Sequence, residues 1–153
     1  MFERILSLVS SKTGFHTELP TADARNALGA LMVRAAKADN AYLFEEVEQI
    51  DAVLSKLYTL NAVQAAKMRA QCELLEEAMP VTADLAGILH DAISMEDREA
   101  AVAALWSVVF ADGFEHEEED ELLHAVEEAL GVLPAAAKRL HDDEMAKRPV
   151  KRV

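Results

Sequence analysis

The sequence predicts an all-α protein, a single bundle of about seven to eight helices. The first observation behind this class is composition, because Ala, Leu and Glu are common while the chain has only 5 Gly and 4 Pro. Such a composition favours helices joined by short loops. The second observation is that no segment alternates apolar and polar residues over the length of a strand. The third is length, since 153 residues suffice to bury one hydrophobic core.

Apolar side chains recur every three or four residues along most of the chain, which is the spacing of a buried helix face. The expected helices cover residues 2–10, 21–37, 44–57, 61–79, 82–93 and 94–110, then one that ends at Leu130 and a last one from Pro134. The stretch from Ser10 to Pro20 is expected to be a loop.

Residues that prefer helix ends mark these boundaries. Thr21 is the expected N-cap of the first long helix, and Asn61-x-x-Gln64 has the form of a capping box. Pro80 cannot continue the helix before it. Gly131 stands where a C-terminal cap glycine belongs, and Pro134 suits the first turn of the last helix.

The charge balance excludes several functions. The chain has 15 basic and 28 acidic residues, a net charge of −13, and this field repels phosphate backbones. Nucleic-acid binding is therefore not expected. No run approaches the roughly 18 apolar residues of a membrane helix, and no secretory signal is recognisable at the N-terminus. We expect a cytoplasmic protein without a membrane span; peripheral membrane association and the oligomeric state stay open.

No motif predicts catalysis. The sequence has no glycine-rich phosphate loop, nucleophile elbow, CxxC or HExxH, so we expect no enzyme, no catalytic residue and no organic cofactor. Cys72, with Met68 and Leu75 at helical spacing, is expected to be a buried apolar residue. Acid–base chemistry would need carboxylates with raised pKa values in a deep pocket.

The chain matches itself without a gap at an offset of 73 residues. Ala38-Asp39 aligns with Ala111-Asp112, and Glu45-Glu46 aligns with Glu118-Glu119. Two unrelated helical hairpins would rarely share the acidic residues of their turns. We therefore predict two copies of a helix–acidic turn–helix unit. The copies and the C-terminal helix with its basic tail cover about residues 21–60, 94–133 and 134–153 of one domain, 1–153.

The two acidic turns are the first candidate metal site. Their carboxylates are Asp39, Glu45, Glu46, Asp112, Glu118 and Glu119. Oxygen ligands suit Ca²⁺ or Mg²⁺ better than Zn²⁺. The turns are not EF-hands, because Ile50 and Leu123 stand where the loop requires a bidentate glutamate. The alternative is that these acids only cap helices and offset the helix dipole, in turns exposed to water where pKa values stay ordinary.

An alternative metal site consists of His116, Asp120 and His124, whose spacing of four places them on one helix face. Such a set could hold Zn²⁺ or Ni²⁺, or it could simply be an exposed polar face. Trp106 and Phe110 stand one helical turn apart, which is typical of core packing, with a binding pocket as the alternative. The remaining histidines are isolated and expected to be incidental: His16, His90 and His141.

The doubled turn resembles the signature of TerB-like domains. Ala38-Asp39-Asn40 precedes Glu45-Glu46, and Phe110-Ala111-Asp112-Gly113 precedes Glu118-Glu119. This all-helical, acidic family includes bacterial tellurite-resistance proteins and the N-terminal domain of a DnaJ-type co-chaperone. The resemblance covers residues 20–133 and implies a non-enzymatic role in bacterial stress response, with divalent-cation binding by the acidic turns.

The first copy departs from the family pattern. It carries Asn40 in place of glycine, and the apolar run Tyr42-Leu43-Phe44 precedes its glutamates. Symmetric use of both turns is therefore an open question. A second hypothesis needs no metal: the protein is a docking module whose acidic face recruits a basic protein partner.

Overall fold

A computed structural model describes residues 22–152 of the protein. The expected helix over residues 2–10, the loop to Pro20 and the cap residue Thr21 lie outside this range. Within it, the prediction of an all-α bundle is confirmed. The helices are α2 (Ala24–Lys37), α3 (Phe44–Tyr58), α4 (Ala62–Ala78), α5 (Thr82–Ala92), α6 (Met95–Val109), α7 (Glu117–Ala129) and α8 (Pro134–Ala146).

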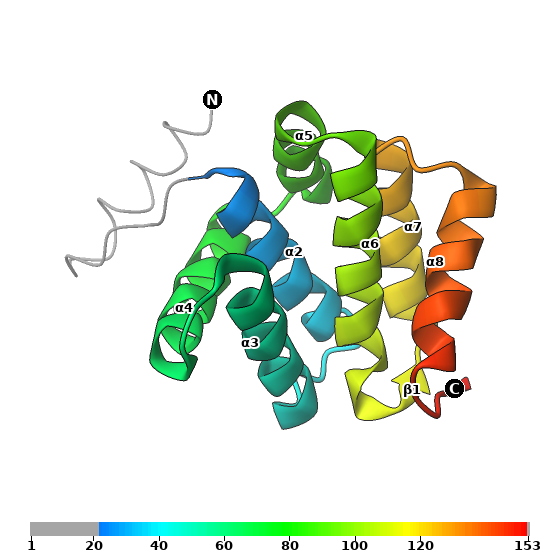
Figure 1. The fold of residues 1–153 in the computed structure, drawn as a ribbon, viewed down its shortest axis with the longest axis horizontal. Coiled ribbons are helices and arrows are strands. Elements are labelled where there is room, and N and C mark those ends of the chain that lie inside the picture. The colour runs from blue at the N-terminus through cyan, green and yellow to red at the C-terminus, as the bar shows by residue number, and fades with distance from the viewer. Residues whose placement is uncertain (1–21, 153) are drawn as a thin grey trace.

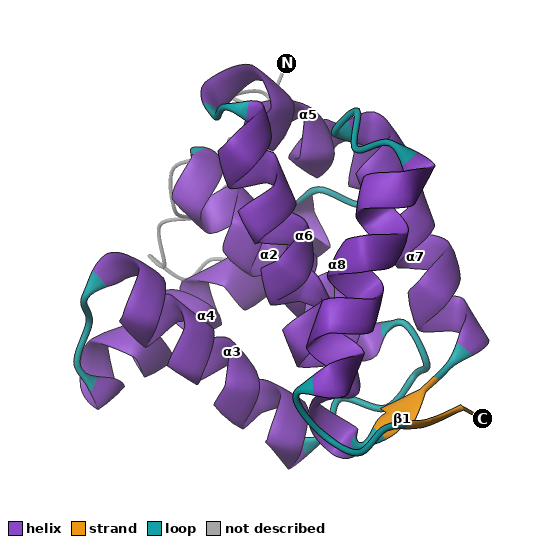
Figure 2. Cartoon of the chain, turned by 45° about the vertical axis from the view of Figure 1, so that its right-hand side comes forward, coloured by secondary structure: helices purple, strands orange, loops and turns teal. Residues whose placement is uncertain are grey.

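Helix α2 is the centre of the bundle and contacts α3, α4, α5, α6 and α7 (Figure 1). Helices α3 and α4 pack against each other on one side of it, and α7 and α8 pack on α6 on the other side (Figure 2). Small buried residues of α2, such as Ala27, Ala30 and Ala35, let the neighbouring helices approach closely. Among residues 22–152, no helix is both long and apolar enough to cross a membrane.

The core confirms the expected roles of several apolar residues. Trp106 and Phe110 are buried, and their rings stack with centroids 5.3 Å apart. Cys72 of α4 is a buried free thiol. Its sulfur lies against Gly29 of α2, where a Cβ atom would overlap it. The glycine therefore sets how closely α2 and α4 pack.

Most helix boundaries agree with the prediction. The capping box of α4 is present, since Gln64 N donates to Asn61 Oδ1 at 2.8 Å and Asn61 N donates to Gln64 Oε1 at 3.0 Å. The expected cap of α2 was wrong. That helix begins at Ala24, and Asp23 accepts the hydrogen bond of Asn26 N at 3.0 Å. Asp is a somewhat better N-cap residue than Thr, so local preference agrees with the cap that the structure shows.

A short strand pair was not predicted. Strand β1 (Phe114–Glu115) pairs in parallel with β2 (Lys151–Arg152), and Lys151 N donates to Gly113 O at 2.9 Å. Two residues are too few to leave an alternating pattern in the sequence. The pair holds the C-terminal segment beside the second acidic turn.

Candidate metal centre

Each acidic turn folds around its aspartate. Asp39 Oδ1 accepts a hydrogen bond from Ala41 N at 3.0 Å, and Asp112 Oδ1 accepts one from Phe114 N at 2.9 Å. Such bonds from an aspartate to the backbone two residues on stabilise a tight turn. In both turns they use Oδ1, so Oδ2 of each aspartate is directed to other partners.

The residue after each aspartate has a left-handed backbone. Its φ angle is 64° at Asn40 and 83° at Gly113. Glycine adopts this region without cost, and asparagine is among the few other residues that visit it routinely. Asn40 therefore supports the same turn as the glycine of the second copy, and this departure from the family pattern does not change the turn.

The two turns meet at one end of the bundle, where the start of α3 lies beside the 3-10 turn η1 (Phe110–Asp112) (Figure 1). His116 lies between them. Its Nε2 is 3.4 Å from Asp39 Oδ2, 3.4 Å from Asp112 Oδ2 and 3.8 Å from Glu119 Oε1. Within residues 22–152, Asp39, His116 and Glu119 are the one group of three potential metal ligands with atoms within 4.8 Å of one another.

Glu46 and Glu119 are at the buried side of this site. Both side chains are 0% exposed. Glu46 Oε1 accepts a capping hydrogen bond from Leu43 N at 3.2 Å, but Glu46 Oε2 and both oxygens of Glu119 have no hydrogen-bond partner among the described residues. A buried polar atom without a partner costs free energy, so these oxygens require an explanation.

Burial and neighbouring charge perturb both glutamates. Burial, together with the charges of Asp39 and Asp112, raises the pKa of Glu46 to about 8 and the pKa of Glu119 to about 9. The expectation of exposed turns with ordinary pKa values was therefore wrong for these two residues. The starts of α3 and α7 face each other across the site, so water is excluded from their inward-facing side chains.

We call this group the turn cluster. It consists of Asp39, Glu46, Asp112, His116 and Glu119. Four of the six predicted carboxylates belong to it, whereas Glu45 and Glu118 are exposed. Successive helical residues point about 100° apart, so one glutamate of each pair faces the site and the other faces water. The histidine of the turn cluster, His116, comes from the alternative metal site of the sequence analysis.

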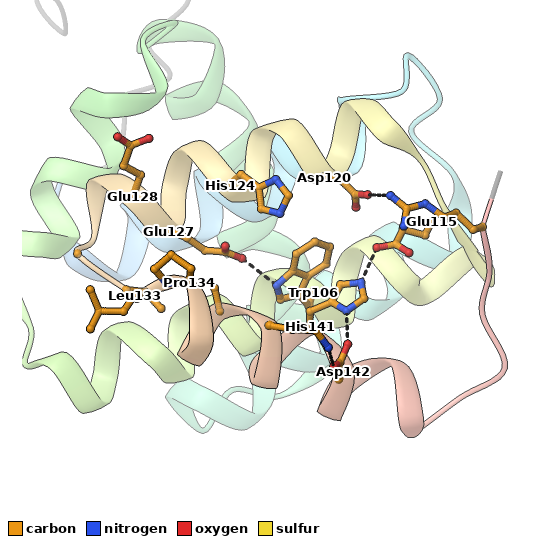
Figure 3. Close-up of a pocket in the computed structure, with 15 residues that line it drawn as sticks. Trp106, Glu115, Asp120, His124, Glu127, Glu128, Leu133, Pro134, His141 and Asp142 are labelled. Atoms are coloured by element: carbon orange, nitrogen blue, oxygen red, sulfur yellow. Dashed lines mark hydrogen bonds and ion pairs between the residues drawn. The ribbon is translucent and has the colours of Figure 1, made fainter.

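The structure separates the three residues of the alternative metal site. His116 is in the turn cluster, Asp120 Oδ2 lies 3.2 Å from Arg152 Nη2, and His124 is exposed beside a cavity between α7 and α8 (Figure 3). His116 is the N-cap of α7 with an extended backbone, so it is not on the helical face of the other two. Eight helical residues also span about 12 Å, too far for one ion.

His141 was expected to be isolated and incidental, and the first part of that expectation was wrong because its side chain has several partners. Its Nε2 lies 2.5 Å from Glu115 Oε1, and its Nδ1 lies 2.9 Å from Asp142 Oδ1 (Figure 3). The imidazole also packs edge-on against Trp106, with centroids 4.7 Å apart. Glu115 and His141 are 26 residues apart and belong to different elements, so no local pattern predicts the pair. His16 lies outside the described residues.

Comparison with known proteins agrees with the resemblance to TerB-like domains. Searches of curated proteins and of solved structures gave no significant match. A family model described as "Tellurite resistance protein TerB" matches residues 25–142. This segment holds both acidic turns and all members of the turn cluster, and it extends from α2 into α8. It covers well over half of the 153 residues, so the chain belongs to the TerB family of tellurite resistance proteins.

Proposed function

We propose that the turn cluster binds a divalent cation and that the protein is a non-enzymatic stress-response module of the TerB type. The observation that carries the proposal is the set of unpartnered oxygens on Glu46 and Glu119. Both residues are fully buried, and the charges of Asp39 and Asp112 act on both of them. A bound cation would supply the missing partner for each of them.

The ligand set indicates which ions to test. The cluster offers Asp39 Oδ2, Asp112 Oδ2, the free oxygens of Glu46 and Glu119, and Nε2 of His116. Carboxylates favour Ca²⁺ and Mg²⁺, as expected for oxygen-rich turns. The imidazole is a ligand that Ca²⁺ and Mg²⁺ rarely take, so it widens the proposal to Mn²⁺.

Cation binding would link the two repeats. Asp39 and Glu46 come from the α2–α3 turn, and Asp112 and Glu119 from the α6–α7 turn. Without a cation, four acidic groups face each other, and protons on the buried glutamates relieve the repulsion. A cation replaces those protons and holds both turns, so occupancy would stiffen this end of the bundle.

The proposed role is binding and not catalysis. Glu46 and Glu119 do have the raised pKa values that acid–base chemistry would require. Neither they nor the other members of the turn cluster line the cavity between α7 and α8, where a substrate would find room.

The test is unfolding of metal-stripped protein with Ca²⁺, Mg²⁺, Mn²⁺, Zn²⁺ or Ni²⁺ added. An ion at a hundred times its dissociation constant should stabilise the fold by about 2.7 kcal/mol. The Asp112→Asn/Glu119→Gln double variant removes two ligands from the cluster. The matched control, Glu45→Gln/Glu118→Gln, also replaces two carboxyl groups with amides, but at exposed positions.

A saturable gain that the ligand variant loses and the control retains would support the proposal. The cation proposal would be abandoned if each ion gave only a weak, non-saturating effect, equal in both double variants and reproduced by NaCl. Such a result would identify the acids as surface charge and helix caps.

A second candidate is the docking module that recruits a basic partner through the acidic face. Exposed apolar side chains beside the acidic turns favour it, since Phe44 is 73% exposed and Phe114 is 43% exposed. Large exposed aromatic residues are common at the centre of protein interfaces. A complex that resists chelators, weakens with salt and is lost in Phe44→Ser would support docking over cation binding.

A further inference from the structure

A cavity of about 810 Å³ lies between α7 and α8, apart from the turn cluster. Figure 3 shows that Trp106 of α6 and His141 of α8 form part of its wall. An apolar stretch at the α7–α8 connection completes it, consisting of Val132, Leu133, Pro134 and Ala137. The volume falls within the range of roughly 300–1,000 Å³ that small-molecule pockets occupy.

The charged residues that line the cavity indicate whether a ligand there would be positive or negative. Lys138 Nζ lies 2.7 Å from Asp142 Oδ2, and Arg152 Nη2 lies 3.2 Å from Asp120 Oδ2. Both permanent cations of the lining therefore have carboxylate partners already, and neither offers an unpaired charge to an anion. Three lining carboxylates have no such cation: Glu115, which pairs with His141, and Glu127 and Glu128 near the end of α7.

Glu127 is the group placed to receive a ligand. It is 4% exposed, and its Oε1 accepts a hydrogen bond from Trp106 Nε1 at 3.1 Å (Figure 3). Its second oxygen has no hydrogen bond among the described residues. Burial raises the pKa of Glu127, against the opposing effects of His124, the indole hydrogen bond and His141. The carboxylate is thus unfavourable as an ion until a positive charge comes close.

We propose that this cavity binds a small organic cation, an ammonium group on an apolar body. The ammonium would donate to the free oxygen of Glu127, and the body would lie on the apolar wall of Val132, Leu133 and Ala137. A metal ion fits less well, because Glu127 belongs to no close group of potential metal ligands among residues 22–152. An anion would meet Glu127 and Glu128, while both permanent cations of the lining are already paired with carboxylates. The inference is independent of the turn cluster.

The single tryptophan makes the test direct. Trp106 is the one tryptophan of the 153-residue chain, and its indole is in the cavity wall. The Nε1–H signal in a ¹H–¹⁵N spectrum therefore reports from the site alone. The probes are n-hexylammonium, 1-hexanol and hexanoate, which share one chain length and differ in charge. We expect n-hexylammonium to shift the signal saturably, and the other two to bind at least tenfold more weakly.

Two variants test the role of Glu127. Glu127→Gln keeps an acceptor for the indole N–H but removes the charge, and it should weaken n-hexylammonium binding at least tenfold. Glu121→Gln is the matched control, because Glu121 is an exposed residue of the same helix outside the lining. It should bind n-hexylammonium as the wild type does. If Glu127→Gln does not fold, Ala137→Leu reduces the cavity volume without changing any charge and should also weaken binding.

Free amines and lysine side chains both carry an ammonium group on an apolar chain. A lysine whose backbone amino and carboxyl groups are both blocked, called the capped lysine, is therefore titrated in the same assay. Tighter binding of n-hexylammonium supports a free amine as ligand, and tighter binding of the capped lysine supports a side chain of a protein partner. The proposal is overturned if 1-hexanol binds as tightly as n-hexylammonium. It is equally overturned if the indole signal does not move, or if Glu127→Gln keeps full affinity in a folded protein.

Discussion

Replacing Glu119 with glutamine should stabilise the metal-free protein at neutral and alkaline pH, although it removes a proposed metal ligand. Glu119 is 0% exposed, and neither of its side-chain oxygens has a hydrogen-bond partner among the described residues. Burial, with the charges of Asp39 and Asp112, raises its pKa from 4.5 to about 9. The folded protein therefore keeps a proton on Glu119 at pH 7 that the unfolded chain has released.

The magnitude follows from this difference in proton binding. The unfolded chain releases this proton with a pKa of 4.5, whereas the folded protein still holds it at pH 7. Raising the pH from 4.5 to 7 therefore lowers the free energy of unfolding by about 3 kcal/mol. Below pH 4.5 both states hold the proton and the loss disappears; it grows as the pH rises and levels off above the folded pKa of about 9. Glutamine does not titrate, so Glu119→Gln should gain up to about 3 kcal/mol at pH 7 and almost nothing near pH 4.

The assay is urea unfolding of wild type and variant at pH 4.5, 7 and 9 with a chelator present. Glu118→Gln is the control, since it makes the same carboxyl-to-amide change at an exposed neighbour and should alter the free energy of unfolding by less than about 0.5 kcal/mol. Adding a cation that binds the turn cluster should make the wild type more stable than Glu119→Gln, because only the wild type gains the binding free energy.

A difference between wild type and Glu119→Gln that is the same at pH 4.5 and pH 9 would refute the reasoning. The carboxyl group would then ionise as freely in the folded protein as in the unfolded chain. Loss of stability in the metal-free variant at every pH would also contradict it, because the carboxyl group would then be making favourable contacts that the structure does not contain.

Three further predictions concern protons and packing. Cation binding at pH 7 should release protons from Glu46 and Glu119, because their pKa values are about 8 and 9. Calorimetry in two buffers of different ionisation enthalpy measures that release. A release of zero would contradict the assignment of both glutamates to the cation site. Gly113→Ala should lower the free energy of unfolding by about 1 kcal/mol in urea titrations, because φ is 83° there although a Cβ would meet no atom closer than 3.8 Å. Gly29→Ala should cost roughly 1–3 kcal/mol through overlap with Cys72 Sγ, and adding Cys72→Ala should recover much of that loss; equal stability of the single and double variants in thermal unfolding would rule out the overlap.

The helices were predictable because their causes are local. The capping box of Asn61 and Gln64, the stop before Pro80 and the first turn at Pro134 each depend on residues within one or two turns. The cap of α2 was missed because Thr21 and Asp23 are both acceptable N-caps only two residues apart, although Asp is the better of the two.

The candidate site was predictable in part. The doubled acidic motif located both turns, but it gave no reason to prefer Glu46 over Glu45 or Glu119 over Glu118. The preferred glutamate occupies the third helical position, where Glu46 accepts the hydrogen bond of Leu43 N and faces inward. His116 was assigned to a helical face with Asp120, whereas its extended backbone turns it towards Asp112 and Asp39.

By itself, the sequence determined the helical class, most helix boundaries, both acidic turns and the family, because these depend on residue preferences and spacing along the chain. Only the tertiary structure decided that the two turns meet, that Glu46 and Glu119 are buried there, and that Glu127 faces a cavity beside Trp106. These features require contacts between residues far apart in the chain, such as Asp39 and His116, which are 77 positions apart. Distance through space and exclusion of water decide them, and neither quantity is a property of a local sequence pattern.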